Sequence, residues 1–379
     1  MDMVVSAQEF RAAAKRRIPH FLFEYYDGAA FTGLTAARNL RDLEAIELRQ
    51  RVLCDVSGIS TSTDLLGEAA SLPLALSPVG LAGMAARRGE VLAAKAARAR
   101  HIPMTLSTTS VCPLDEVAAV RPPWFQLYMV RDRAFVAEML DWAVAQGCTT
   151  LFFTVDLPVM GTRWRDHHSG LYQPGVKGLF RRYGQMLARP SWAARVGLRG
   201  RPHNLGNIAH HLGNPEASLT DCMVYTNANK EDCLDWSALG WVRQRWPGKL
   251  VVKGIMECED ARLAMDGGAD AIVVSNHGGR QLDGAASTAS ALLRIVDSLD
   301  GRLPILVDGG VRSGLDILRM LAIGANGVMM GRPWVYALAA AGQAGVERLI
   351  HILEEELRIA MALCGCRSLR DVSRDIIRL

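Results

Sequence analysis

Short apolar runs recur along the chain from residue 74 onward, and each has the length and composition of a buried strand. Eight of these runs are predicted as strands, at residues 74–77, 104–107, 124–128, 150–155, 250–253, 271–275, 305–308 and 327–330. Patterns typical of helices follow most of them, as at residues 89–100, 132–146, 261–266 and 315–323. Strands that alternate with helices indicate a parallel sheet, and eight of them predict a closed (β/α)8 TIM barrel.

Two segments depart from this alternation. Residues 8–17 predict a helix ahead of the barrel, and an aromatic run follows it at residues 21–26. About 100 residues separate the fourth predicted strand from the fifth, several times the spacing of a strand–helix repeat. We therefore expect one barrel domain over residues 1–379, with an N-terminal helical extension and a long insertion at roughly residues 169–236.

Composition narrows the class of protein. The chain has 379 residues, of which 50% are hydrophobic and 22% charged, enough apolar material for a large core. A net charge of +4 is small for this length and gives no general case for nucleic acid. The eight cysteines are scattered without the spacing of a zinc site, so no metal is expected. Residues 1–17 lack the apolar core of a signal peptide and no long apolar run follows, which favours the reducing cytoplasm.

Candidate chemistry is concentrated at residues 275–283, Ser-Asn-His-Gly-Gly-Arg-Gln-Leu-Asp, where the sixth strand ends. Histidine exchanges a proton near neutral pH, and the planar guanidinium of arginine matches a carboxylate. His277 and Arg280 together therefore indicate chemistry on a carboxylic acid. Taken alone, they could equally be loop residues that face solvent.

The other strand ends favour the first interpretation, because active residues of TIM barrels gather where strands end. Lys253 ends an apolar run, and since a buried Lys needs a partner, we expect it to meet the charge of a ligand. Residues 308–310, Asp-Gly-Gly, and 331–332, Gly-Arg, follow the last two strands, where this architecture binds phosphate. Ordinary turn glycines are the alternative for either motif. No GxGxxG sequence opens a helix after the first strand, so a Rossmann domain is not indicated.

These residues resemble a known family. The runs at 124–128 (Trp-Phe-Gln-Leu-Tyr), 154–156 (Thr-Val-Asp), 252–254 (Val-Lys-Gly), 275–283, 308–312 (Asp-Gly-Gly-Val-Arg) and 331–333 (Gly-Arg-Pro) are similar to those of FMN-dependent 2-hydroxy-acid oxidases and dehydrogenases. The resemblance covers nearly the whole chain. Residues 78–90, 106–113 and 165–170 resemble most the quinone-linked L-lactate dehydrogenases of bacteria.

The resemblance implies oxidation of L-lactate to pyruvate with FMN as cofactor, a membrane quinone as electron acceptor and assembly into a homo-oligomer. Three alternatives stay open. The substrate could be mandelate or glycolate, oxygen could be the acceptor, or the barrel could bind a phosphate ligand without redox chemistry.

The resemblance also implies roles for individual residues. His277 would be the general base, and Asp156 would stabilise its protonated ring. Arg163 and Arg280 would hold the substrate carboxylate, with Tyr25 and Tyr128 donating hydrogen bonds. The residues implied to contact FMN are Ser77, Pro78, Val79, Gly80, Ser107, Gln126, Thr154, Lys253, Ser275, Asp308, Gly310, Arg312, Gly331 and Arg332. The resemblance implies alanine at position 80 in the oxidases and glycine in the membrane-associated dehydrogenases. Gly80 therefore favours an electron acceptor other than oxygen.

The insertion has an unusual charge. Residues 169–215 contain no Asp or Glu, but they contain seven Lys and Arg residues interleaved with apolar ones. Leu179, Tyr183 and Met186 are predicted to share one helical face. A basic amphipathic segment of this kind favours contact of residues 173–215 with a membrane surface, and the enzyme would then lie peripherally on the cytoplasmic side of the inner membrane. A mobile lid or an oligomer contact is the alternative.

Overall fold

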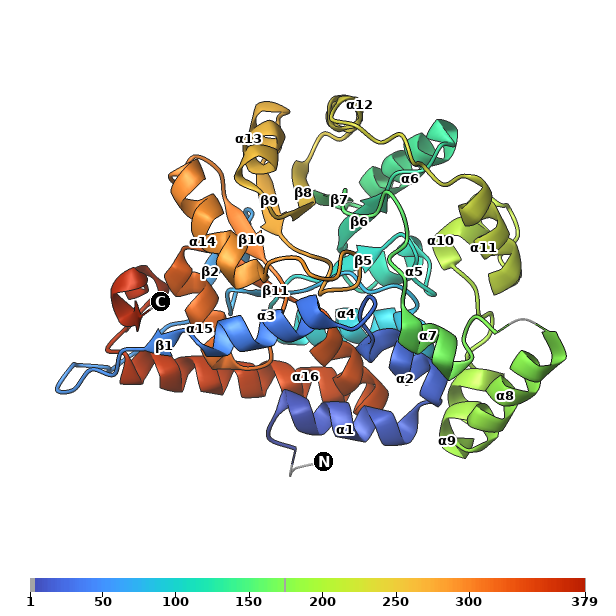
Figure 1. Cartoon of the computed structure of the whole chain (residues 1–379), viewed down its shortest axis with the longest axis horizontal. Helices are drawn as coiled ribbons and strands as arrows, with labels where there is room; N and C mark the ends of the chain where they lie inside the picture. The colour runs from blue at the N-terminus through green and yellow to red at the C-terminus, as the bar shows by residue number, and fades with distance from the viewer. Residues whose placement is uncertain (1–3, 174, 379) are drawn as a thin grey trace.

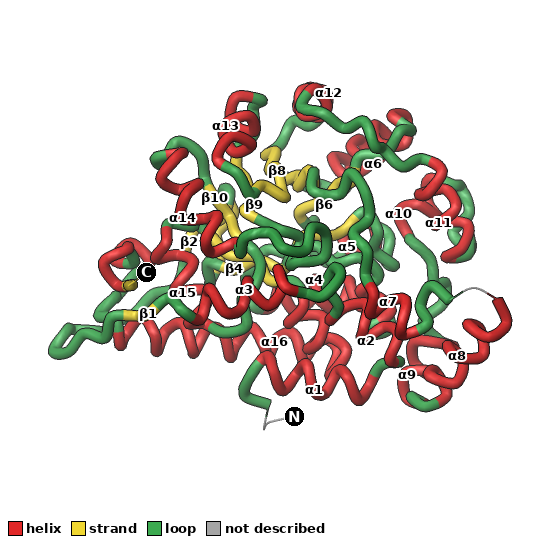
Figure 2. Tube along the Cα trace, in the orientation of Figure 1, coloured by secondary structure: helices red, strands yellow, loops and turns green. Residues whose placement is uncertain are grey.

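The computed structural model describes residues 4–173 and 175–378. Its eight-stranded parallel sheet has the order β4-β11-β10-β9-β8-β7-β6-β5, and a bridge between Leu76 and Met104 joins its two ends. The sheet therefore closes and helices surround it, which confirms the predicted TIM barrel (Figure 2). Its strands are β4 (Leu74–Leu76), β5 (Thr105–Ser107), β6 (Trp124–Tyr128), β7 (Thr150–Thr154), β8 (Lys249–Ile255), β9 (Ala271–Val274), β10 (Ile305–Val307) and β11 (Gly327–Met330).

Several predicted strand ends were wrong by one residue. Ser77, Val155, Ser275 and Asp308 lie just past β4, β7, β9 and β10, whereas β8 continues two residues beyond Lys253. The difference matters, because a residue past the strand end belongs to the loops that build a site at this face of a barrel.

The interior of the barrel is filled by side chains, as alternation along each strand requires. Residues that point inward form one fully buried cluster, which includes Ala75, Trp124, Phe152, Val251, Val273, Leu306 and Met329. Leu65 and Ala70 join this cluster from the hairpin of β2 (Thr63–Leu65) and β3 (Glu68–Ala70). Since the cluster leaves no channel, the carboxyl end is the face left for a ligand.

Helices cover the outside of the barrel, and those near residues 89–100, 132–146, 261–266 and 315–323 lie where they were predicted. They are α4 (Gly89–Ala99), α5 (Leu114–Ala118), α6 (Arg133–Ala145), α13 (Cys258–Asp266), α14 (Thr288–Leu299), α15 (Gly314–Ile323) and α16 (Arg332–Leu363). A small sheet of β1 (Glu47–Leu48) and β12 (Ile377–Arg378) joins the C-terminal end of the chain to the segment that precedes the barrel.

The N-terminal extension consists of α1 (Ala7–Arg17), α2 (His20–Asp27) and α3 (Leu34–Glu44), and the aromatic run at 21–26 forms most of α2. Asp27 anchors it: the carboxylate accepts hydrogen bonds from Arg11 of α1 (2.5 Å), Arg165 (2.7 Å) and Tyr336 of α16 (2.7 Å). Burial alone raises the pKa of Asp27, but these three donors bring that pKa far below its usual range. The charged carboxylate thus fixes the end of α2 on the barrel.

The insertion between β7 and β8 holds six α-helices and one π-helical turn, and it divides into two parts. The outer part comprises α8 (Gly175–Leu187), α9 (Pro190–Trp192) and the turn at Ala193–Leu198, which lie at one corner of the molecule (Figure 1). The inner part comprises α10 (Gly206–His211) and α11 (Leu219–Ala228). Helix α7 (Trp164–Ser169) precedes the outer part, and helix α12 (Ser237–Arg245) follows the inner part. No helix in the described part of the chain combines the length and apolarity needed to cross a bilayer.

The face predicted for the basic helix is only partly correct. Met186 packs against the core, whereas Leu179 and Tyr183 are exposed as expected. Val176, Phe180 and Leu187 complete the exposed apolar face of α8, with 73% of Phe180 and 76% of Leu187 accessible.

Candidate active site

A cavity of about 330 Å³ opens at the carboxyl ends of the barrel strands. Most of the predicted site residues line it: Tyr25, Ser77, Pro78, Val79, Gly80, Tyr128, Thr154, Arg163, Lys253, His277, Arg280, Asp308, Gly310, Arg312, Gly331 and Arg332. Ser107, Gln126, Asp156 and Ser275 do not line it, but each contacts a residue of the site or its wall, as described below. The structure thus brings together residues that are up to 307 positions apart in the sequence, from Tyr25 to Arg332.

His277 lies in a conformation that L-residues rarely adopt, with a φ of +55°. Its Nδ1 is 2.9 Å from Oδ1 of Asp156, which follows β7. Nδ1 therefore carries the proton that it donates to the carboxylate, and Nε2 remains as the basic nitrogen of the ring. Burial raises the pKa of Asp156, but the nearby His277 and Lys253 outweigh burial and leave this pKa below its ordinary value.

Two arginines line the cavity, of which Arg163 is buried and Arg280 is half-buried. Nη1 of Arg280 donates to the carbonyls of Tyr25 (2.7 Å) and Gly28 (2.9 Å), whereas Nε of Arg163 has no partner among the described residues. Burial lowers the pKa of Arg280 to about 10, and the positive charges of Arg163 and Arg332 add to this effect. An anion between these side chains would relieve their repulsion, which makes this part of the cavity suitable for a carboxylate.

Asp166 lies behind the arginines and had no predicted role. It is fully buried, and neither carboxylate oxygen has a hydrogen-bond partner among the described residues. Burial raises the pKa of Asp166, although the positive charges of Arg280 and Arg163 oppose this. Its place beside the arginine pair was invisible in the sequence, where three positions separate it from Arg163 and 114 from Arg280.

Lys253 already has a charged partner within the chain. Its Nζ lies 2.8 Å from Oδ2 of Asp308 and donates to Oγ of Ser275 at 2.7 Å. We expected Lys253 to be buried because it meets the charge of a ligand. The ion pair with Asp308 explains its burial without a ligand. Because the pair is held at two points, the ammonium group has a fixed position at the cavity wall.

A set of buried polar atoms around the cavity has no hydrogen-bond partner among the described residues. They are Oγ of Ser77, Nε2 of Gln126, Oγ1 of Thr154, Oδ1 of Asp308 and Nε of Arg332. Leaving a buried polar group unpaired costs about 1–3 kcal/mol, so such a group is expected to meet a ligand. Ser107 orients one of them, since its Oγ donates to Oε1 of Gln126 at 3.0 Å and so turns Nε2 outward. The set contains both donors and acceptors, as a polar heterocycle requires of its binding site.

The glycine-rich strand ends have a packing reason besides any anion. Gly310 has a φ of +87°, and a Cβ there would lie 2.2 Å from the carbonyl oxygen of Asn39. Nη1 and Nη2 of Arg332 donate to the carbonyls of Gly278 (2.9 Å) and Gly28 (2.7 Å), so these two groups are engaged within the protein. Packing against α3 therefore requires glycine at position 310, whether or not an anion binds there.

The N-terminal extension supports the loop that carries His277. Asn39 and Asn276 exchange two amide hydrogen bonds of 2.9 and 2.8 Å, and both side chains are buried. Asp283 accepts from the backbone of Thr32 and Thr35. Asparagines 237 positions apart carry no pairing signal in a single sequence, and these contacts were not predicted.

Asn207, on the inner part of the insertion, makes several side-chain hydrogen bonds that the sequence did not predict. It is fully buried, and its Nδ2 lies within 3.2 Å of the carbonyls of Ser107 and Thr108 and of Oγ of Ser110. Its Oδ1 accepts from the backbone of Leu114 at 2.8 Å. The insertion thus holds the end of β5 and the loop after it, next to Ser107, which is paired with Gln126 of β6.

Gly80 faces the cavity at a tight contact. A Cβ at this position would lie 2.5 Å from Oγ1 of Thr109 and 3.4 Å from the hydroxyl of Tyr25. Alanine at position 80 would require Thr109 to move. The absence of a side chain at Gly80 therefore leaves room for Thr109, which lies in the loop after β5 that Asn207 holds.

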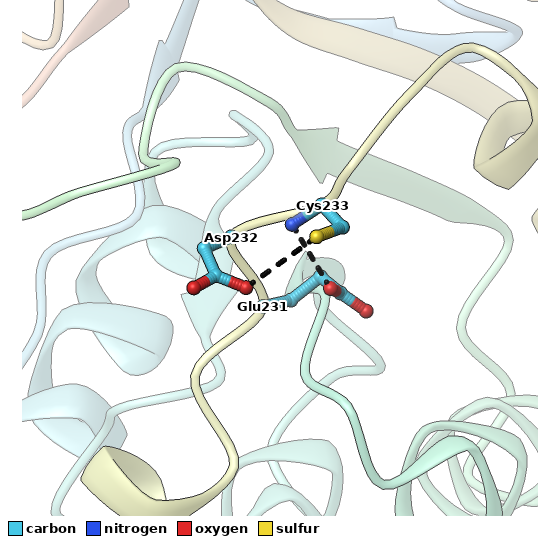
Figure 3. A group of neighbouring side chains, drawn as sticks. All are labelled: Glu231, Asp232 and Cys233. Atoms are coloured by element: carbon cyan, nitrogen blue, oxygen red, sulfur yellow. Dashed lines mark hydrogen bonds between the residues drawn. The ribbon is translucent and has the colours of Figure 1, made fainter.

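One group of possible metal ligands lies on the loop after α11, outside the cavity chemistry described above, where Glu231, Asp232 and Cys233 approach one another (Figure 3). Both carboxylates are engaged with arginines, Glu231 with Arg133 at 2.7 Å and Asp232 with Arg131 at 3.1 Å. Because the arginines already balance their charge, the cluster gives no reason to propose a bound cation.

Comparison with known proteins identifies one family. The sequence profile described as FMN-dependent dehydrogenase matches residues 14–379. The chain is 52% identical to an L-lactate dehydrogenase of Ectopseudomonas mendocina (strain ymp), over 99% of both chains. It is 54% identical to an L-lactate dehydrogenase of Stenotrophomonas maltophilia (strain R551-3), over 98% of both.

Solved structures give the same result. The monotopic membrane protein (S)-mandelate dehydrogenase superposes with a TM-score of 0.93 at 31% identity, over 99% of both chains. A mandelate oxidase superposes with a TM-score of 0.83 at 36% identity, over 99% of this chain and 98% of that one.

Proposed function

The chain belongs to the FMN-dependent dehydrogenase family, and from that premise we propose that it oxidises L-lactate to pyruvate and delivers the electrons to a membrane quinone. The observation that carries the proposal is His277, held at Nδ1 by Asp156 in the same cavity as two carboxylate-binding arginines. The full-length L-lactate dehydrogenase relatives support the choice of acid.

The unpaired polar atoms of the cavity fit FMN. Its ring edge offers alternating carbonyls and nitrogens, which match Gln126 Nε2 and Thr154 Oγ1, and its ribityl hydroxyls match Oδ1 of Asp308. Lys253 and Ser275 would hold positive charge at the ring edge. The remaining contacts would come from Ser77 through Gly80, Ser107, Gly310, Arg312, Gly331 and Arg332. When bound, FMN accepts the two electrons that the substrate carbon gives up.

His277 acts as the base in this proposal. Its Nε2 takes a proton from the substrate, either from the hydroxyl or from the α-carbon. The Asp156 carboxylate stabilises the imidazolium that forms, because it is buried, charged and 2.9 Å away. The constrained backbone of His277 keeps Nε2 aimed at one point.

The carboxylate of the acid lies between Arg163 and Arg280, where it replaces repulsion between two cations with attraction to both. Burial raises the pKa of Tyr128 well above its ordinary value, so its hydroxyl stays protonated and acts as a hydrogen-bond donor. Tyr25 donates from the opposite side, next to Gly80.

Attachment to a membrane is the remaining part of the proposal. Helix α8 exposes a row of apolar side chains, and the exposed cations Lys177, Arg195, Arg199 and Arg201 lie on or near it. An apolar face flanked by cations binds a surface of anionic lipid. We place the enzyme peripherally, on the cytoplasmic face of the inner membrane as the resemblance implies.

Anaerobic reduction of the bound flavin tests the proposal. L-lactate should bleach the visible flavin absorbance rapidly, and D-lactate should not. The similarity to (S)-mandelate dehydrogenase makes mandelate the rival substrate, so both acids are compared at equal concentration. Faster bleaching by mandelate would mean that mandelate, and not lactate, is the substrate. Absence of bleaching by any 2-hydroxy acid would contradict the proposed chemistry.

A further inference from the structure

The active-site cavity extends beyond the residues that the chemistry uses. One wall of this extension follows β6 and β7 and consists of Met129, Val130, Leu157 and Met160. Another part of the lining belongs to the insertion, with Leu205, Met223 and Leu234. A β-bridge between Val130 and Lys230 joins the two parts, and we name the space that they line the vestibule.

L-lactate has little use for such a space. Its side chain is a single methyl group, and its carboxylate and hydroxyl are accounted for by Arg163, Arg280 and His277. Seven apolar residues, three of them methionines, remain without a role in binding it. A ligand larger and more apolar than the substrate is therefore needed to explain the vestibule.

The lining suits a flat ring that carries carbonyl groups. Methionine is flexible and polarisable, and its sulfur makes favourable contacts with ring edges. Polar groups also line the cavity there: Asn227 and Lys230 contribute from α11 and the loop after it, and both can donate to a carbonyl oxygen. Glu231 also lines the cavity, but Arg133 balances its charge at 2.7 Å.

The lining of the vestibule reaches both the surface of the molecule and the segment that leads into α8. Met160 and Met223 line the cavity and are also 49% and 37% exposed, so they form an apolar mouth. Tyr172 lines the same cavity three residues before α8 begins. Arg182 of α8 donates to the carbonyls of Gly170 and Gln173, which ties the basic helix to this part of the cavity wall.

We propose that the vestibule binds the ring of a lipid-soluble quinone, which reaches it from the membrane past Met160 and Met223. This inference rests on the proposed function and adds to it the place where the electron acceptor binds. L-lactate loses two electrons and two protons to become pyruvate, and the quinone gains two electrons and two protons to become the quinol. One of these protons is taken up by His277, the other is released from the substrate as the electron pair is transferred, and no further oxidant is required.

Met223→Asp tests the proposal, because it places a charge in the apolar mouth without touching the catalytic groups. Val224→Asp is the matched control: it introduces the same charge at the next position of α11, where the side chain is 63% exposed and does not line the cavity. Flavin content and far-UV circular dichroism report whether each variant folds.

Three rates are measured on each protein: anaerobic bleaching by L-lactate, recovery of absorbance with a short-chain ubiquinone analogue, and recovery with ferricyanide. We expect Met223→Asp to slow recovery with the quinone at least about tenfold, because burying a charge opposes binding of an apolar ring. The other two rates should change less than about twofold, and Val224→Asp should change none of the three by more.

Unchanged recovery with the quinone in Met223→Asp would overturn the vestibule assignment. If bleaching by a long-chain 2-hydroxy acid falls while the quinone step does not, the vestibule is a substrate subsite instead. Flavin reduced with dithionite allows the quinone step to be read even when L-lactate is not the substrate. Failure of the proposed substrate and failure of this inference therefore give different results.

Discussion

The catalytic rim and the outer part of the insertion distribute polar and apolar side chains in opposite ways. In the rim, charged groups are buried: Lys253, Arg163 and Asp308 are 4%, 6% and 8% exposed. On α8, large apolar groups are exposed, most of all Phe180 and Leu187. Each arrangement reverses the usual preference of its residues. Lys253 and Asp308 balance each other at 2.8 Å, but Arg163 and the unpaired polar atoms of the rim, like the exposed apolar groups of α8, are costly unless something outside the chain completes them.

What completes each region differs. The buried charges and unpaired polar atoms of the rim need a polar ligand with a defined shape, because hydrogen bonds are directional. The exposed face of α8 needs only an apolar surface with negative charge, because burial of apolar area is not directional. We therefore expect changes in the rim to affect chemistry alone and changes on α8 to affect attachment alone.

The largest effect should come from His277→Gln. Without the basic nitrogen, anaerobic bleaching by substrate should slow roughly 10⁴-fold, at the upper end of what a general base contributes. Binding of the variant to anionic vesicles should equal that of the parent protein. A bleaching rate within tenfold of the parent would remove His277 from the role of base.

Asp156→Asn should slow the same step by roughly 10²-fold, since an amide cannot balance the charge of the imidazolium.

The pKa of Asp156 is lowered in the folded protein from its ordinary 3.8. Its charged form therefore stabilises the fold above pH 3.8, and this contribution disappears as the pH falls through the lower, folded-state pKa. Urea unfolding of both proteins across that range should show the difference between them shrinking toward low pH. A difference that grows toward low pH would contradict this assignment.

Phe180→Asp combined with Leu187→Asp should weaken binding to anionic vesicles by about thirtyfold, from about 1 kcal/mol of lost apolar burial for each side chain. Bleaching by L-lactate should not change. Ile359→Asp with Leu363→Asp is the matched control, since these apolar residues of α16 are 57% and 53% exposed on another helix. Equal loss of binding in both double variants would mean that α8 is not the attachment surface.

Asn207→Leu tests the inner part of the insertion, which lies between the two regions compared. Leaving the carbonyls after β5 unpaired should loosen Ser107 and Gln126 and weaken FMN binding by about tenfold. Flavin fluorescence during titration of the apoprotein measures this affinity, and the visible spectrum of bound flavin should shift.

Asn204→Leu is the control for Asn207→Leu, because Asn204 is equally buried but bonds only to carbonyls of the insertion itself, at Pro215 and Ala217. Equal weakening of FMN binding in the two variants would make Asn207 a residue of general stability with no specific effect on the cofactor.

The sequence by itself determined the barrel and the position of its reactive end. Apolar runs and helical patterns are local properties, and the closure of eight strands follows from their number. His277, Lys253 and Asp308 could be placed at that end because each stands where a run stops. The cavity lining agrees with those positions.

The tertiary structure decided which of these groups are partners. The pairing of Lys253 with Asp308, the clamp of Asn207 on the loop after β5 and the clash that requires glycine at position 310 join segments far apart in the chain. Such contacts depend on how the barrel closes and on where α3 and the insertion dock upon it. The same holds for α8, where contact with the core turned Met186 inward and left Phe180 and Leu187 exposed. Periodicity fixes the order of side chains around a helix, but only packing against neighbours decides which part of that face meets solvent.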